Sequence, residues 1–278
     1  MSNQDMRTHA CNDRVAAIEL ASVVNDVELV QGEIFQSGVP AANLYSHPNM
    51  ENACQLLFGQ DFRVLETRDG WCFGQILADG YVGYIQQLDL VKFEPPTHWV
   101  TNLGSGLYKQ GDLKAPLISW LPMGSMVAVD SVDIDFACLR NGLFVPRAHL
   151  SRINAYDRSF IRVAQKFIGC PYLWGGQTLL GIDCSGLVQV ALHACGIQCP
   201  RDSDQQVEEL GTFLSPKARP DRGYLAYWKG HIGIMLDETN LLHANAHTMN
   251  VIIEPLSEVT DRIKKANNDI LIGYKDLS

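Results

Sequence analysis

Residues 181–192 of this chain read Gly-Ile-Asp-Cys-Ser-Gly-Leu-Val-Gln-Val-Ala-Leu, a glycine-led turn followed by an apolar run with helical spacing. Asp183 is a residue type that caps helix N-termini, so Cys184 is expected in the first turn of a helix. A thiol there faces unpaired backbone N–H groups and the positive end of the helix dipole, and both favour the thiolate. The pattern indicates a nucleophilic cysteine, with a cysteine that only packs in the core as the alternative.

Two histidines downstream supply a candidate base and a candidate orienting group. His231 opens the short apolar run His-Ile-Gly-Ile-Met-Leu, and His243 lies in a second one, Leu-Leu-His-Ala-Asn-Ala. Cysteine, histidine and a further polar residue fit a thiol triad of nucleophile, base and a group that fixes the base's tautomer. The alternative is a pair of half-buried strand histidines bonded to the backbone. All three segments together favour the triad.

These motifs, in this order, resemble those of the NlpC-type peptidases, a papain-like family that cleaves bacterial cell-wall peptides. Upstream, residues 169–176, Gly-Cys-Pro-Tyr-Leu-Trp-Gly-Gly, resemble the family's Pro-Tyr-x-Trp-Gly-Gly signature. Downstream, Pro-Arg-Asp-Ser at 200–203 resembles the segment that follows the catalytic helix. The resemblance covers roughly residues 153–278.

The resemblance implies a role for each matched residue. Cys184 is the expected nucleophile, His231 the expected base and His243 the expected third member. Tyr172 matches the aromatic side chain that the family places beside the sulfur. The backbone N–H of Cys184 is expected to help hold the oxyanion.

The catalytic region, residues 153–278, is expected to be an α+β domain with the papain-like fold. Apolar residues on one face predict an amphipathic helix over 157–168, and the nucleophile helix follows. The start of that helix is expected to pack against a mostly antiparallel sheet. Its strands are predicted near 223–228, 231–236, 240–245, 249–254 and 270–275.

The region before residue 153 shows short β-like runs between turn residues. Asp69-Gly70 and Asp79-Gly80 are hairpin signals, and closely spaced strands of this kind predict a small barrel. The sequences of residues 56–60, 69–71 and 79–85 resemble those of bacterial SH3-like domains. A β extension packed on the enzyme is the alternative for the second barrel. The expected segments are a lead-in at 1–25, SH3-like all-β barrels at 26–93 and, in degenerate form, at 94–152, and the catalytic domain at 153–278.

The charge and the apolar runs of the chain argue against nucleic acid and membranes as partners. The chain has 278 residues and a net charge of −9, without a long block of Lys and Arg, so nucleic acid is not an expected partner. No run reaches the ~20 apolar residues of a membrane span. Charged residues interrupt the N-terminal region, where a signal peptide would have an apolar core. We therefore expect no membrane association and a cytoplasmic location.

Cysteine usage predicts neither disulfides nor a metal site. The eight cysteines are expected to be free thiols, because the chain shows no export signal. Cys195, Cys199 and His193 lack the second paired cluster that would complete four zinc ligands. Neither a metal ion nor another cofactor is expected.

The combination of domains resembles the γ-D-glutamyl-L-diamino-acid peptidases of murein recycling. The resemblance implies a murein-derived peptide as substrate, with a free N-terminal L-Ala, cut between γ-D-Glu and meso-diaminopimelate or lysine. Asp183, Ser185, Tyr81 and Glu51 are the candidates for binding the L-Ala ammonium, with Tyr84 as the alternative aromatic residue. For Asp183 a capping role alone, and for Glu51 a surface position alone, are the alternatives.

Two other functions remain open at this stage. One is an exported murein hydrolase or amidase whose SH3-like domains bind the intact wall. The other is a non-catalytic murein-binding protein on a peptidase fold, which the presence of all three triad residues opposes.

Overall fold

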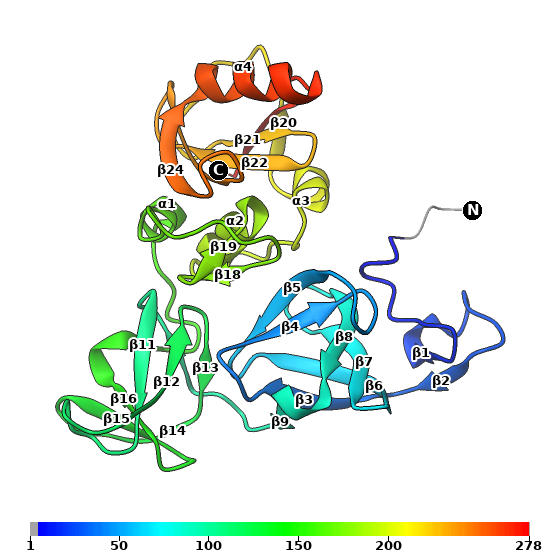
Figure 1. The fold of residues 1–278 in the computed structure, drawn as a ribbon, viewed down its shortest axis with the longest axis vertical. Coiled ribbons are helices and arrows are strands. Elements are labelled where there is room, and N and C mark those ends of the chain that lie inside the picture. The colour runs from blue at the N-terminus through cyan, green and yellow to red at the C-terminus, as the bar shows by residue number, and fades with distance from the viewer. Residues whose placement is uncertain (1–4, 278) are drawn as a thin grey trace. The chain divides into compact units, whose positions relative to one another are not determined.

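The computed structural model describes residues 5–277. The chain, drawn in Figure 1, divides into two compact units, one up to Ala155 and one from Tyr156. Each unit has apolar clusters of its own. Within residues 5–277 no disulfide joins two cysteines, and no group of three or more His, Cys, Asp or Glu could hold a metal ion. The longest helix of this part of the chain, α4 (Leu256–Asn267), has 12 residues, and no helix has the length and apolar character that crossing a bilayer requires.

The first barrel of the N-terminal unit is one seven-stranded sheet with the neighbour order β5-β4-β8-β7-β6-β3-β9. The predicted hairpin turn at Asp69-Gly70 is confirmed: both residues have positive φ, as a two-residue turn between twisted strands requires. The strands are β3 (Glu33–Ser37), β4 (Ala41–Tyr45), β5 (Asn52–Leu57), β6 (Asp61–Arg68), β7 (Trp71–Ile76), β8 (Val82–Gln86) and β9 (Leu90–Lys92), with the 3₁₀ helix η2 (Gln87–Asp89) before β9.

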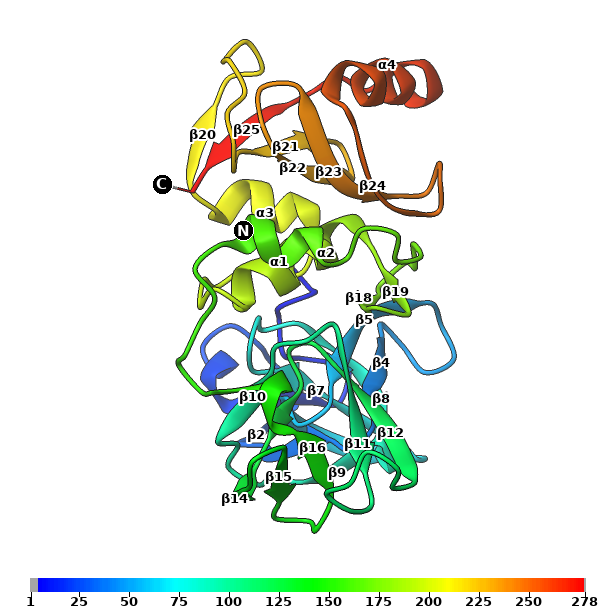
Figure 2. The same cartoon turned by 90° about the vertical axis from the view of Figure 1, so that its left-hand side faces the viewer.

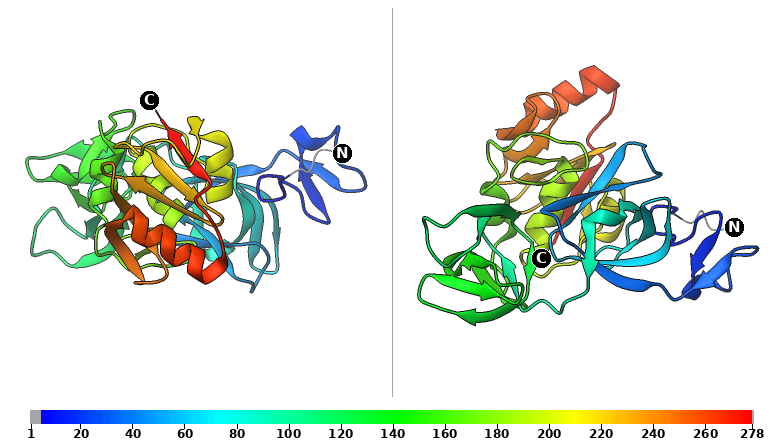
Figure 3. Two further views of the ribbon diagram at one scale, coloured as in Figure 1. Left: turned by 90° about the horizontal axis from the view of Figure 1, so that it is seen from above. Right: turned by 60° about the horizontal axis from the view of Figure 1, so that its bottom comes forward.

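The described part of the predicted lead-in, residues 5–25, contains β1 (Val15–Ala17) and the 3₁₀ helix η1 (Ile18–Leu20). β1 pairs in parallel with β2 (Glu28–Val30), which lies past the predicted boundary at residue 25. Val15 and Ala17 pack with Phe73 and Tyr84 of the first barrel. Figure 3 shows the pair at one end of that barrel. The lead-in is therefore attached to the barrel by an apolar cluster of its own.

The second barrel consists of a three-stranded sheet, β13-β10-β17, and a five-stranded sheet, β12-β11-β16-β15-β14. Its core contains Val100, Leu107, Leu121 and Val145, and Phe58 of the first barrel packs against this cluster. Whether this region is a degenerate SH3-like domain or a β extension stays a prediction. As in the first barrel, a 3₁₀ helix precedes the last strand. The elements are β10 (His98–Val100), β11 (Gly104–Tyr108), β12 (Leu117–Pro122), β13 (Met126–Val127), β14 (Val129–Val132), β15 (Phe136–Leu139), β16 (Phe144–Pro146), η3 (Arg147–His149) and β17 (Leu150–Arg152).

The C-terminal unit is built on a six-stranded antiparallel sheet with the order β20-β25-β21-β22-β23-β24. Five of its strands overlap the predicted ones, while β20 was not predicted. A two-stranded ribbon, β18 (Gln177–Thr178) and β19 (Gly181–Ile182), leads into the nucleophile helix. The sheet strands are β20 (Thr212–Leu214), β21 (Leu225–Trp228), β22 (His231–Met235), β23 (Asn240–Asn245), β24 (Asn250–Pro255) and β25 (Gly273–Asp276).

Helices cover both faces of this sheet. Figure 2 shows α4 on one side and the helices α1 (Phe160–Gln165), α2 (Cys184–His193) and α3 (Ser203–Glu209) on the other. α1 is shorter than the predicted helix over 157–168 at both ends. It starts after its N-cap Ser159, whose side chain accepts the N–H of Arg162, and it ends at Gln165 with Lys166 as C-cap. Residues Cys184–Leu192 of α2 are all buried, so the helix that carries the candidate nucleophile lies inside the domain.

Candidate active site

The start of α2 places the candidate nucleophile where the sequence predicts it. Asp183 is the N-cap of the helix, and its carboxylate accepts the backbone N–H of Gly186 at 2.7 Å. Cys184 is the first helical residue. The predicted capping role of Asp183 and the helix-start position of Cys184 are both confirmed.

The Cys184 side chain lies against β22. The backbone N–H groups of Ile232, the residue after His231, and of Ser185 stabilise a negative charge on its sulfur. The side chain is only 8% exposed, however, and burial, followed by the charge of Asp183, raises the pKa of the thiol to about 12. The expected lowering of this pKa is therefore wrong for the resting structure, because burial outweighs the helix start.

The two candidate histidines are bonded to each other. His231 Nε2 on β22 and His243 Nδ1 on β23 lie 2.8 Å apart, and the two rings meet edge to face. Burial, followed by electrostatic interaction with His243 and Arg262, lowers the pKa of His231 to about 3. His231 is therefore neutral and able to accept a proton. Burial also lowers the pKa of His243, which favours its neutral form. The alternative of two strand histidines bonded only to the backbone does not describe this pair.

Behind His243 lies a carboxylate that the sequence analysis missed. His243 Nε2 is 2.8 Å from Oε2 of Glu254 on β24, and Arg262 on α4 donates two hydrogen bonds to that carboxylate. The predicted strands at 240–245 and 249–254 did not fix the register between them. The observed four-residue turn after Asn245 pairs His243 with Ile252, which puts residue 254 diagonally across the hairpin on the same face.

Tyr172 lies in the segment before α2. Its backbone N–H donates to the carbonyl of Met249 at 2.9 Å, and its backbone also bridges to Ile182, two residues before the nucleophile. Burial, followed by the charges of Cys184 and Asp183, raises the pKa of Tyr172. The phenol is thus in the electrostatic neighbourhood of the sulfur, and its role beside the reacting atoms stays a prediction.

Asp183 and Ser185 are engaged with a buried arginine. Arg201 is 1% exposed and donates to both oxygens of Asp183, at 3.0 and 2.7 Å, and to the Ser185 hydroxyl at 2.8 Å. The Gly175 N–H, the Gly186 N–H and the Ser185 hydroxyl also donate to Asp183. A carboxylate has about four acceptor sites, so these donors fill the capacity of Asp183. Binding of a substrate ammonium by Asp183 or Ser185 stays a prediction.

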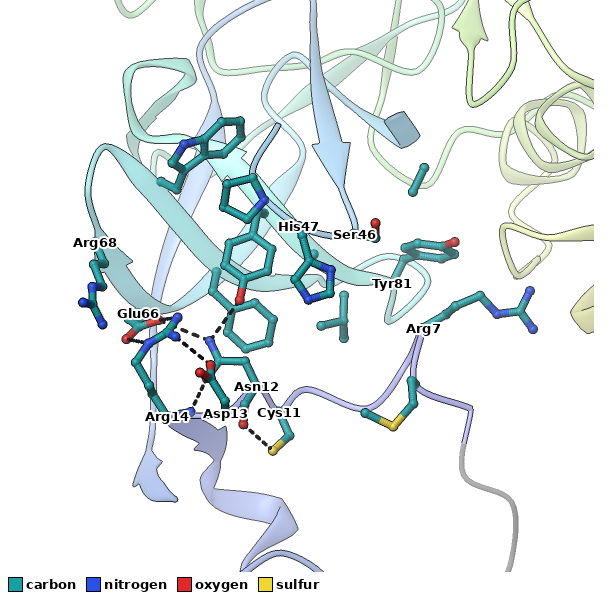
Figure 4. Close-up of a pocket in the computed structure, with 18 of the residues that line it drawn as sticks. Arg7, Cys11, Asn12, Asp13, Arg14, Ser46, His47, Glu66, Arg68 and Tyr81 are labelled. Atoms are coloured by element: carbon teal, nitrogen blue, oxygen red, sulfur yellow. Dashed lines mark hydrogen bonds and ion pairs between the residues drawn. The ribbon is translucent and has the colours of Figure 1, made fainter. Parts of the chain in front are cut away.

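The candidates from the SH3-like region belong to the N-terminal unit. Tyr81 lines a cavity of about 1090 Å³, shown in Figure 4, with Tyr84 and His47 among the other lining residues. Inside it the Arg14 guanidinium and the Glu66 carboxylate form two hydrogen bonds of 2.7 Å. Glu51 is exposed before β5. The parts of Tyr81, Tyr84 and Glu51 in substrate binding stay predictions.

Nucleophilic acyl transfer is the chemistry that this arrangement suits. A thiol stands at a helix start, and a neutral imidazole stands on the neighbouring strand with a second imidazole bonded behind it. Two of the first N–H groups of α2 are already engaged: that of Gly186 donates to Asp183, and that of Ser185 donates to the sulfur. The N–H of Cys184 is therefore the candidate donor to the oxyanion.

Two family models match the chain. The NlpC/P60 family matches residues 169–265, which contain Cys184, His231 and His243. The bacterial dipeptidyl-peptidase Sh3 domain matches residues 44–90, which contain Glu51 and Tyr81.

Whole-chain comparisons extend these matches. Dipeptidyl-peptidase 6 of Lysinibacillus sphaericus is 25% identical over 244 residues, covering 78% of this chain and 89% of the relative. The gamma-D-glutamyl-L-lysine dipeptidyl-peptidase of Bacillus subtilis is 25% identical over 224 residues, covering 73% and 76%. The crystal structure of an NlpC/P60 family protein from Bacillus cereus aligns with a TM-score of 0.74 at 19% identity, covering 88% of this chain and 99% of that one, which indicates the same fold.

Proposed function

We propose that this chain, a cysteine peptidase of the NlpC/P60 family, hydrolyses the bond between γ-D-glutamate and a diamino acid in murein peptides. The diamino acid is lysine or meso-diaminopimelate, and the peptide begins with a free L-Ala. In this proposal the substrate is a released wall fragment, and the enzyme acts in the cytoplasm in murein recycling.

One observation carries the proposal. The alignment with the gamma-D-glutamyl-L-lysine dipeptidyl-peptidase covers 73% of the chain, whereas the unit that bears the triad begins only at Tyr156. The likeness therefore runs beyond the catalytic domain into the SH3-like region. A shared domain combination supports a shared substrate class more strongly than a shared catalytic domain does.

The chemistry uses the neutral pair that the structure contains. As the sulfur of Cys184 attacks the γ-carbonyl carbon of D-glutamate, its proton moves to His231, and the oxyanion is held at the start of α2. The proton then passes from His231 to the leaving amine of the diamino acid, and a thioester remains on Cys184. Water, activated by His231, hydrolyses the thioester and releases L-Ala-D-Glu with the thiol restored.

Product analysis with matched peptides tests the proposal. L-Ala-γ-D-Glu-L-Lys should yield L-Ala-D-Glu and lysine, while the N-acetylated tripeptide should react ~10³-fold more slowly, because a site built for an ammonium leaves its acceptors unpaired. Intact sacculi should release nothing. Equal kcat/KM for the two peptides would favour the exported wall hydrolase, and cleavage of neither by the folded enzyme would contradict the proposal.

A further inference from the structure

The hairpin of β23 and β24 brings a carboxylate to the far side of the histidine pair. His243 stands opposite Ile252 in the register, and Glu254 opposite Leu241, so His243 and Glu254 are diagonal neighbours on one face. Their Nε2 and Oε2 atoms are 2.8 Å apart. His243 is 1% exposed, so this contact is shielded from water.

The carboxylate decides which nitrogen of His243 carries the proton. Burial raises the pKa of Glu254, but hydrogen bonds from Arg262 and His243 outweigh it and leave the pKa below its usual value, so the group is ionised and can only accept. Asn245 Nδ2 is an amide donor that lies 3.4 Å from the same Nε2 atom. The contact with the Glu254 carboxylate is shorter, at 2.8 Å, and decides the tautomer. His243 therefore carries its proton on Nε2, and its Nδ1 is an acceptor.

The tautomer of His243 sets that of His231. Because His243 Nδ1 accepts, the 2.8 Å bond requires His231 to donate from Nε2. A neutral imidazole has one ring proton, so His231 Nδ1 is then left with its lone pair. That is the state in which His231 can remove a proton from a thiol.

We infer that Glu254 is a positioning residue of the catalytic site, which acts through His243 to keep the Nδ1 lone pair of His231 available to the Cys184 thiol. Arg262 holds the carboxylate by two hydrogen bonds of 2.9 and 2.6 Å from its guanidinium. The four residues form one hydrogen-bonded series from β22 to α4. The inference rests on the proposed peptidase activity but not on the identity of the diamino acid.

Kinetics with four variants separate positioning from a structural ion pair. Glu254→Leu should lower kcat by ~10²-fold with KM little changed, and Glu254→Gln, which keeps one acceptor oxygen, should recover part of the loss. Arg262→Leu removes the ion pair but leaves the acceptor, so its loss should stay below ~10-fold. The matched control is Glu258→Gln, which removes an exposed carboxylate from α4, the helix of Arg262. Its kcat and KM should equal those of wild type.

The pH profile gives opposite signs for the two partners. The titratable and charged groups that act on His231 are the His243 ring, Arg262 and Glu254. Arg262 lowers and Glu254 raises the pKa of His231. The acid limb of kcat/KM should therefore move to lower pH in Glu254→Leu and to higher pH in Arg262→Leu. Equal losses of kcat and shifts of the same sign in both variants would overturn the inference.

Nitrogen NMR of the histidine rings tests the inference without activity. In wild type, His243 should be the Nε2–H tautomer, and in folded Glu254→Leu the Nδ1–H form should appear. An unchanged tautomer, or kcat within ~3-fold of wild type, would overturn the role of Glu254. An inactive wild type with the expected tautomers would instead contradict the proposed function alone.

Discussion

Burial keeps both members of the Cys184–His231 pair neutral at rest. The pKa of Cys184 is raised to about 12 and that of His231 is lowered to about 3, in each case first by burial. A charged pair at this place requires compensation, which the N–H groups of Ile232 and Ser185 give the sulfur and Glu254 gives the imidazole. Proton transfer is thus coupled to the attack on substrate.

The buried His231 makes stability depend on pH. Its pKa is about 6.5 when unfolded and about 3 when folded, so the unfolded chain binds the extra proton between these values. The free energy of unfolding should therefore fall as the pH decreases from 6.5 to 3, and His231 accounts for at most about 5 kcal/mol of this fall. Above pH 6.5, His231 should make no pH-dependent contribution to stability.

Urea unfolding of wild type and His231→Gln at a series of pH values measures this contribution. The stability difference between the two proteins should change with pH only on the acid side. Parallel curves from pH 7 to pH 4 would contradict the lowered pKa of His231.

At the scale of elements, α2 depends on the contact between its cap and Arg201. Asp183 serves both as the N-cap and as the counter-ion of a guanidinium that is 1% exposed. Removal of one partner from a buried pair leaves an uncompensated charge, which costs far more than loss of an exposed pair. The start of α2 is therefore held from outside the helix.

Asp183→Asn separates the two roles, because asparagine caps a helix but does not neutralise an arginine. We expect a loss of about 3 kcal/mol in the free energy of unfolding. The matched control is Glu238→Gln, which removes the exposed pair with Arg219 and should leave the melting temperature unchanged. Similar small effects in both variants would show that Arg201 is not held by the charge of Asp183.

Sequence reasoning succeeded where the signal is local and failed where the partner comes from another element. The cap at Asp183, the turn at Asp69-Gly70 and five strands of the catalytic sheet follow from neighbouring residues. α4 was missed although its apolar residues have helical spacing. The pKa of Cys184 was misjudged, because helix position is visible in sequence and depth of burial is not. Glu254 required the hairpin register.

At the scale of the whole molecule, the two barrels of the N-terminal unit meet at a glycine. Gly59 has φ +70°, and a Cβ there would lie 2.0 Å from the carbonyl oxygen of Met126. The N–H of Met126 in turn donates to the carbonyl of Phe58 at 2.8 Å. A side chain at residue 59 would therefore push the second barrel's backbone away.

Gly59→Ala should destabilise the N-terminal unit more than Gly70→Ala. Both residues have positive φ, but a Cβ at Gly70 meets nothing within 4 Å. Strain alone should cost about 1–2 kcal/mol at Gly70, and the clash at Gly59 should add about 1–3 kcal/mol. Equal free energies of unfolding for the two variants would contradict the close approach of the barrels.

The rate at which Cys184→Ala releases L-Ala-D-Glu from L-Ala-γ-D-Glu-L-Lys tests the catalytic assignment most directly. Cys195→Ser, which changes a half-buried cysteine of the same domain, is the control. The account predicts a loss of at least ~10³-fold for Cys184→Ala at an unchanged melting temperature, and near wild-type turnover for the control. More than ~1% residual activity in folded Cys184→Ala would contradict Cys184 as the nucleophile.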